Sequence, residues 1–179
     1  TLDAPFRAED AATVPVHIVQ TQGTPRITRL TLVVDENPSP VVATFTFGPA
    51  MAPLDLETRI RVNAYSNVRA IAETEDGALH MAGRYVRAAG GCSAPASKDA
   101  AAALAALGQM KTRWYSAEPA ASGTRREAQV MLRHPNYSGL QRNQVTHLFV
   151  PARFIDTLEV RQGAEVLFRM EGGISISED

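Results

Sequence analysis

Short runs of β-branched and aromatic residues, separated by turn signals, constrain the fold of this chain more than any other feature. Residues 41–47 alternate threonine with phenylalanine toward their end, which is the two-residue period of a half-buried strand. The same texture recurs at 14–19, 27–34, 58–63, 68–72 and 79–88. Many short strands at this spacing predict a β-sandwich for the first half of the chain rather than a helical or βαβ fold.

Two of the segments between the predicted strands contain residues that strongly favour turns. Asp35–Pro40 contains two prolines, which cannot donate to a strand ladder, and Asn37, which favours turns. Glu75–Gly77 is a tight-turn signal between two of the predicted strands. No Cys-Trp-Cys pattern of antibody domains occurs, so the term immunoglobulin-like describes the expected architecture only.

The texture changes after the last of these strands. Residues 99–107 are almost pure helix formers, Ser97 is placed to cap their start and Gly108 to end them. The last third is again β-like, and Arg161–Gly163 is a hairpin candidate. Its predicted strands are 127–133, 145–150, 154–160, 165–170 and 174–178. We therefore predict an all-β chain of two immunoglobulin-like sandwiches joined by a short Ala-rich helix.

The charge balance and hydropathy of the chain exclude several classes of partner. The net charge is -1 and the pI about 6.4, so no basic excess exists to bind the phosphate backbone of nucleic acid. No apolar run approaches the roughly 20 residues that span a bilayer, and we expect no membrane insertion. The sequence opens at Thr1 without an initiator Met or a visible signal peptide, which is compatible with a processed or trimmed form.

The usual catalytic and metal-binding motifs are missing from the sequence. The four histidines, His17, His80, His134 and His147, show no paired spacing on a helix, and ordinary strand or turn roles are the better interpretation. We predict no metal site, no cofactor and no catalytic residues. Trp114 and the adjacent tyrosine more often serve packing than ligand stacking.

Cys92 is the one residue whose context suggests chemistry. It is the single cysteine, which excludes an intramolecular disulfide, and it lies between Gly90-Gly91 and Ser93. Glycine frees the backbone, so we expect an exposed thiol on a flexible arm made of Gly90, Gly91 and Ser93. Such a thiol suits a group that is handed to another protein better than a fixed nucleophile. An incidental loop cysteine is the alternative.

Arginines on the strand before this cysteine bear on its reactivity. Arg84 and Arg87 would lower the pKa of the Cys92 thiol if they lay beside it. An exposed lone thiol also predicts a disulfide-linked homodimer through Cys92 on air oxidation, reversible by reductant.

Four segments of the first half resemble the SoxY carrier domain of sulfur oxidation, in the same order. They are Asp35–Pro40, Thr58–Arg61, Glu75–Gly77 and Gly90–Cys92. Arg133–Gly139 and Val150–Ile155 in the last third resemble SoxZ, and Gly172–Asp179 is similar to the ending of fused SoxYZ-like carriers associated with quinoprotein dehydrogenases. The resemblance places the domains at 1–93 and 109–179, with a helical linker at 94–108.

This resemblance implies a non-catalytic periplasmic carrier. Cys92 would hold a sulfur-containing intermediate covalently, and periplasmic redox or hydrolytic enzymes, with a quinoprotein dehydrogenase system as one option, would load and unload it. Here the chain continues after Ser93, whereas the SoxY arm is a free C-terminal tail, so the arm sweeps less volume. A non-covalent accessory or assembly module for a quinoprotein dehydrogenase is the alternative function, and a structural protein with an incidental thiol is the third.

Overall fold

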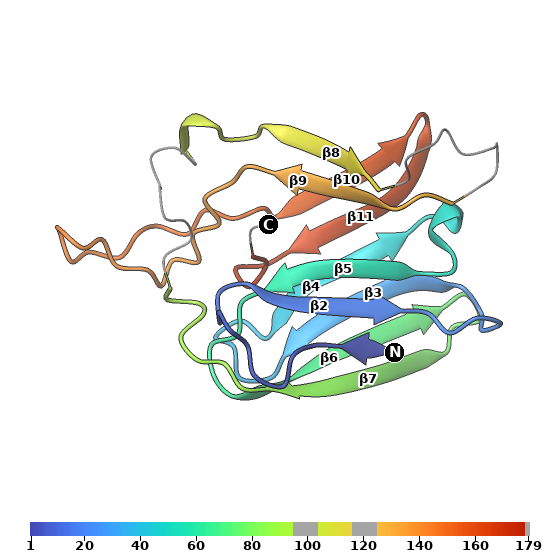
Figure 1. Cartoon of the computed structure of the whole chain (residues 1–179), viewed down its shortest axis with the longest axis horizontal. Helices are drawn as coiled ribbons and strands as arrows, with labels where there is room; N and C mark the ends of the chain where they lie inside the picture. The colour runs from blue at the N-terminus through green and yellow to red at the C-terminus, as the bar shows by residue number, and fades with distance from the viewer. Residues whose placement is uncertain (95–103, 116–124, 178–179) are drawn as a thin grey trace.

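A computed structural model describes residues 1–94, 104–115 and 125–177 of the chain (Figure 1). Strands dominate these residues, and the only helix with its own bounds among them is the 3-10 turn η1, Pro49–Met51. The predicted all-β class is confirmed. Most of the predicted Ala-rich helix lies outside the described residues, and helical backbone is recorded only at 104 and 105. No helix among the described residues is long and apolar enough to cross a membrane.

The strands agree closely with the sequence pattern in the first half of the chain, where β2, β3 and β4 have the predicted bounds. In order they are β1 Leu2–Asp3, β2 Val14–Val19, β3 Ile27–Val34, β4 Val41–Phe47, β5 Asp55–Ile60, β6 Ser66–Thr74, β7 Leu79–Val86, β8 Met110–Trp114, β9 Ala128–Leu132, β10 Thr157–Gln162 and β11 Glu165–Gly172.

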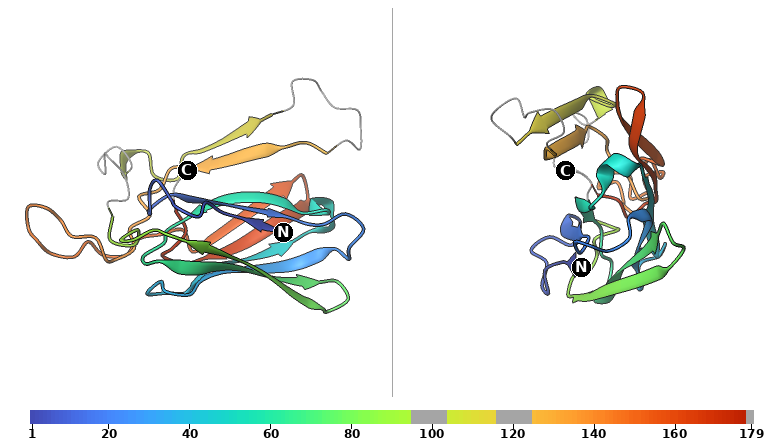
Figure 2. Two further views of the ribbon diagram at one scale, coloured as in Figure 1. Left: turned by 60° about the horizontal axis from the view of Figure 1, so that its bottom comes forward. Right: turned by 90° about the vertical axis from the view of Figure 1, so that its right-hand side faces the viewer.

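The strands form two layers. One layer is a six-stranded sheet in the order β10-β11-β4-β3-β6-β7. The other contains the sheet β1-β2-β5 and the separate hairpin β8-β9, as the end-on view in Figure 2 shows. The arrangement is consistent with immunoglobulin-like SoxY and SoxZ folds. The predicted hairpin at Gly163 joins β10 to β11, and β11 pairs antiparallel with β4, with Met170 opposite Phe45. The two regions of the chain therefore share one sheet.

The core lies between the two layers of the first region. Val14, Val16 and Ile18 of β2 point inward with period two and are buried, and Leu30 and Leu32 of β3 are buried from the opposite layer. Because every second residue of each strand faces this core, the alternation in the sequence fixes the register of the strands.

Two predicted strands of the last third are wrong, and one observed strand lacks a prediction. The run 145–150 is a loop, because the Asn143 side chain accepts the backbone N–H groups of Val145 and Thr146 at 2.9 Å each and so holds the chain in a turn. The run 174–178 forms no strand in its described part and makes a single bridge from Ile176 to Ile60. The strand β8 was not predicted.

Candidate functional site: a buried cysteine between the two regions

The cysteine loop, residues 90–94, lies against the chain that follows β5. The N–H of Gly90 donates to the carbonyl of Asn63 at 2.8 Å, and the N–H of Gly91 donates to the carbonyl of Val62 at 3.1 Å. The loop then turns back on itself, because Ala94 N–H donates to the Gly90 carbonyl at 3.0 Å. The backbone is therefore fixed on both sides of Cys92.

Glycine has different roles at the two positions before the cysteine. Gly90 has φ of +78°, a conformation that favours glycine. A Cβ on Gly91 would lie 2.0 Å from the Ala11 carbonyl oxygen and 2.6 Å from that of Val62, so no side chain fits. Gly91 thus permits close packing of two backbones in the closed structure. A hinge role for these glycines stays a prediction.

The expectation of an exposed thiol is wrong for this structure. Cys92 is buried, with 0% of its surface accessible, while Ser93 beside it is exposed. Sequence reasoning treated the glycines as a source of freedom, but here they let the cysteine loop pack tightly against the strands. The third option, a structural thiol, gains weight from this burial.

The second region of the chain covers the cysteine. The Ser138 hydroxyl donates to the Cys92 carbonyl, and the Gln141 side-chain amide donates to the Ala94 carbonyl at 3.3 Å. The Gln141 side-chain oxygen accepts the Ser138 N–H at 2.9 Å, which orients both groups. Ser138 and Gln141 are themselves buried. They lie in a turn that belongs to the SoxZ-like segment of the sequence.

A buried polar network continues from the cysteine into both regions. Asn37 donates its amide to the Arg61 carbonyl at 2.8 Å and to the Ser175 hydroxyl at 2.9 Å, and accepts the Asn63 N–H at 2.8 Å. The Arg61 guanidinium donates to the Gly91 carbonyl at 2.8 Å. Ser175 reaches this position because Arg61 N–H donates to its carbonyl at 2.8 Å, which holds the C-terminal segment beside β5.

The electrostatics of the site favour a neutral thiol. Burial raises the pKa of Cys92, a hydrogen bond with Ser175 and the positive charge of Arg61 act in the opposite direction, and the net shift is upward. The cation that acts on the thiol is Arg61, and neither Arg84 nor Arg87 contributes as the sequence suggested. Since the thiolate is the reactive form, the closed site keeps Cys92 inert through both burial and protonation.

The histidines take structural or surface roles. His17 on β2 is 2.6 Å from the Asp55 carboxylate on β5. His134 accepts the N–H of Asn136 on its ring nitrogen at 3.0 Å, the local turn role expected for it, and burial lowers its pKa. No group of three or more metal-ligating side chains gathers within the part of the chain that the structure describes.

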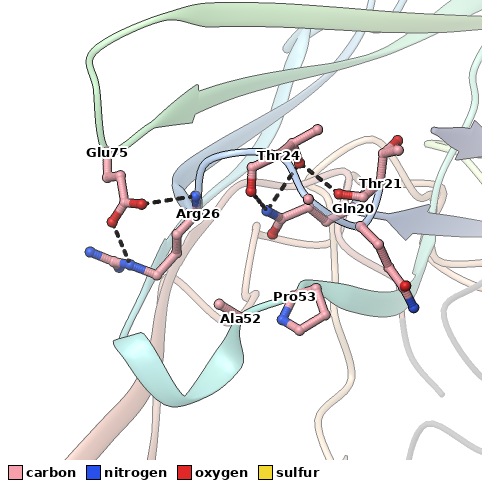
Figure 3. A pocket seen from close by; sticks show the side chains of 9 residues that line it. Gln20, Thr21, Thr24, Arg26, Ala52, Pro53 and Glu75 are labelled. Carbon is pink, nitrogen blue, oxygen red and sulfur yellow. Dashed lines mark hydrogen bonds and ion pairs between the residues drawn. The ribbon is translucent and has the colours of Figure 1, made fainter.

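A shallow pocket lies at the other end of the molecule from the cysteine loop (Figures 1 and 3). The polar groups around it are occupied with one another. Gln20 accepts the Leu54 N–H at 3.0 Å and donates to the Pro25 carbonyl at 2.9 Å, and Arg26 pairs with Glu75 at 3.3 Å. These bonds join loops at the end of the sandwich and indicate a structural role.

The residues that surround Cys92 were missed as site residues, although a signal was present. Arg61 ends one of the segments that resemble SoxY, and Ser138 lies in a segment that resembles SoxZ. Asn37 lies in another of the SoxY-like segments, where the sequence predicts a turn role for it. Only long-range contacts reveal that these positions meet, because Asn37 and Ser175 are 138 residues apart in the chain.

Comparison with known families agrees with this division. Residues 1–92 match the family described as sulfur oxidation protein SoxY, and residues 113–179 match the family described as sulphur oxidation protein SoxZ. The SoxY match covers more than half of the chain. The chain therefore belongs to the SoxY family and continues into a SoxZ domain in the same polypeptide. Membership implies a carrier role in sulfur oxidation together with partner enzymes.

Solved structures add little to this assignment. A superoxide reductase (neelaredoxin) from Ignicoccus hospitalis and two of its variants match 49% of this chain and 77% of their own, at 15–16% identity and TM-scores of 0.40–0.42. Likeness at this level carries no argument about function. No curated protein matches the chain.

Proposed function

We propose that this protein is a periplasmic carrier that holds a sulfur-containing intermediate covalently on Cys92 and presents it to partner enzymes. One observation carries the proposal. The SoxY match ends at Cys92, the single cysteine of the chain, and both regions of the protein bind the loop around it. The periplasmic location and the covalent role are both part of the proposal.

A buried thiol needs an opening step before it can carry anything. Among the described residues, five hydrogen bonds join the backbone of the cysteine loop to the rest of the protein, besides the side-chain bond of Cys92 with Ser175. The five run from Gly90 and Gly91 N–H, and to the carbonyls of Gly91, Cys92 and Ala94. At a net contribution of about 1 kcal/mol each, they hold the loop closed by roughly 5 kcal/mol. The open form is then present in about one molecule in several thousand. A partner that binds the open form would raise this population.

Opening of the cysteine loop also restores the reactivity of the Cys92 thiol. In water the pKa of Cys92 returns toward its ordinary value and a thiolate becomes available. The thiolate can attack the outer sulfur of a persulfide or polysulfide, so that one S–S bond forms, another breaks and the leaving sulfur departs as a thiolate. Joining to thiosulfate instead releases the thiol proton and two electrons, which a redox partner enzyme must accept.

Mass spectrometry of protein purified from its host tests the proposal. Cells grown on a reduced sulfur compound should yield a fraction of the chain with a sulfur adduct, and peptide mapping should place it on Cys92. A Cys92→Ser variant expressed in the same way should carry none. Only free thiol or a simple dimer under every growth condition on sulfur compounds would count against a carrier.

The burial of Cys92 favours a second candidate function. In a non-covalent accessory or assembly module, for example for a quinoprotein dehydrogenase, the thiol would only fill space in the network around Arg61 and Ser175. A Cys92→Ser variant would then keep full partner binding and full activity in vivo. The carrier proposal expects the same variant to fold normally and to lose function in vivo entirely.

A further inference from the structure

The loop that follows Gln141 combines order with exposed apolar side chains. We define the tip loop as residues 142–149. Its two ends are joined by a bridge between Arg142 and Phe149, and the N–H of Val150 donates to the Gln141 carbonyl at 2.9 Å. Inside it, Asn143 N–H donates to the Leu148 carbonyl at 2.9 Å. These bonds give the tip loop a defined shape.

Three large apolar side chains of the tip loop face solvent. Val145 is 87% exposed, Leu148 70% and Phe149 57%. Monomeric proteins seldom expose adjacent apolar groups of this size without a partner that covers them. In Figures 1 and 2 the tip loop projects beyond the body of the sandwich, at the end where the chain leaves β7 toward Cys92.

The charged side chains close to the tip loop in the sequence are all positive. Residues 128–155 contain the cations Arg133, Arg142 and Arg153 and no aspartate or glutamate. The Arg142 guanidinium lies over the Phe149 ring, 4.6 Å from its centre, so a cation sits within the apolar cluster itself. A surface of this kind complements an apolar recess with acidic residues at its rim.

The tip loop is also continuous with the contacts that hold Cys92. Gln141, which donates to the Ala94 carbonyl, directly precedes Arg142. Its backbone carbonyl is bonded to Val150 at the other end of the loop. A protein bound to the tip loop would therefore lie next to the two side chains that cover the cysteine loop.

We propose that the tip loop is the docking surface for the enzyme that loads Cys92, and that this enzyme offers it an apolar recess with an acidic rim. This inference rests on the carrier function proposed above. Docking there places the partner beside Ser138 and Gln141, where its binding stabilises the open form of the cysteine loop. The occupant is an enzyme rather than a second copy docked through the same loop, because two tip loops in contact would bring Arg142 of one copy against Arg142 of the other.

The test measures how fast enzymes in a periplasmic extract load Cys92 with a sulfur adduct. The purified full-length chain in its thiol form is added to periplasmic extract from its host, supplied with thiosulfate, and the adduct is followed by intact mass spectrometry. We expect Leu148→Asp to slow loading at least tenfold. Leu79→Asp is the matched control, because Leu79 is 71% exposed but lies at the opposite end of β7. It should load at the wild-type rate.

Two further measurements separate docking from other causes. Arg142→Glu should slow loading several-fold and reduce its dependence on salt, because screening acts on the charges that dock. Reaction of Cys92 with a small disulfide reagent should be equal in wild type and Leu148→Asp, since that variant leaves Ser138 and Gln141 in place.

Equal loading of Leu148→Asp and wild type would overturn the docking surface. Loss of a dimer in Leu148→Asp, with loading unchanged, would overturn it in favour of a second copy of the chain. Absence of any adduct on wild type in every extract would overturn the carrier function itself, and the docking inference with it.

Discussion

The two regions of the molecule are built on different principles. Among the described residues, every buried hydrophobic side chain except Met170 and Ile176 comes from residues 1–92. The second region contributes buried polar residues instead, namely Asn136, Ser138, Gln141 and Ser175. The first region thus supplies most of the apolar core. The second adds strands to its sheet and supplies the polar groups that close over Cys92.

This difference means that groups from both regions enclose the cysteine loop. A cysteine loop on the first region alone would lose its bonds to Ser138, Gln141 and Ser175, and the thiol would face solvent. Among the described residues, the second region therefore supplies three of the side chains that enclose the cysteine loop. The variants that follow test this difference between the two regions, with the strongest effect first.

The apolar core of the first region should dominate stability. Leu32→Ala, at a fully buried site in β3, should lower the free energy of unfolding by about 2–5 kcal/mol. Leu158→Ala, at a half-buried site in β10, should cost about 1 kcal/mol because less surface is lost. Urea denaturation measures both. Equal losses would contradict the contrast between the regions.

Gly91→Ala should open the cysteine loop, because the added Cβ would overlap the backbone oxygens of Ala11 and Val62. We expect a loss of about 1–3 kcal/mol and a Cys92 thiol that reacts roughly ten- to a hundredfold faster than in wild type. Gly90→Ala is the control, since its Cβ meets only the Ser93 hydroxyl at 3.9 Å and the cost comes from its φ of +78°. A slow thiol in Gly91→Ala would show that the loop packs differently.

Ser138→Ala should loosen the cysteine loop without unfolding the protein. Removal of its bond to the Cys92 carbonyl, worth about 1 kcal/mol, should speed alkylation of Cys92 about fivefold. Ser93→Ala is the matched control, since Ser93 is exposed and its hydroxyl donates within the loop, to the Gly90 carbonyl at 3.1 Å. An unchanged alkylation rate in Ser138→Ala would mean that the second region does not restrain the loop.

The pH dependence of stability should show the smallest effect. The pKa of Cys92 is raised in the folded protein, so its contribution is present below the ordinary thiol pKa of about 8.5 and is lost as pH rises through the folded value. Wild type should lose slightly more stability than Cys92→Ala between pH 8 and pH 10. Parallel curves in thermal unfolding would show that the thiol ionises as readily in the folded protein as in the unfolded one.

The sequence predicts the first region well because its strands bury alternate residues. At β2, β3 and β4 the alternation in the sequence agrees with the burial in the fold, and the observed strand bounds equal the predicted ones. In the second region they diverge. Val145–Val150 has the composition of a strand but forms a loop, because Asn143 holds its start in a turn and no strand among the described residues pairs with it. From the sequence alone, the exposed apolar residues of this loop cannot be distinguished from core residues.

The candidate site was only half predictable for a related reason. Cys92 could be singled out as the candidate carrier residue from its neighbours and from the SoxY resemblance. Its burial could not be predicted, because the groups that enclose it come from positions 61, 138 and 175 and meet only through the tertiary fold. Glycine before a cysteine permits a mobile arm and a tightly packed loop equally.

The rate of Cys92 alkylation as a function of urea tests the central claim most directly. If the closed cysteine loop protects Cys92 and loop opening exposes it, the thiol should react about a thousandfold more slowly than in the unfolded chain. At low urea its reaction should pass through an opening that exposes much less surface than global unfolding does. A rate equal to that of the unfolded chain would mean an exposed thiol. A urea dependence identical to that of global unfolding would mean a purely structural one, and either result would contradict this account.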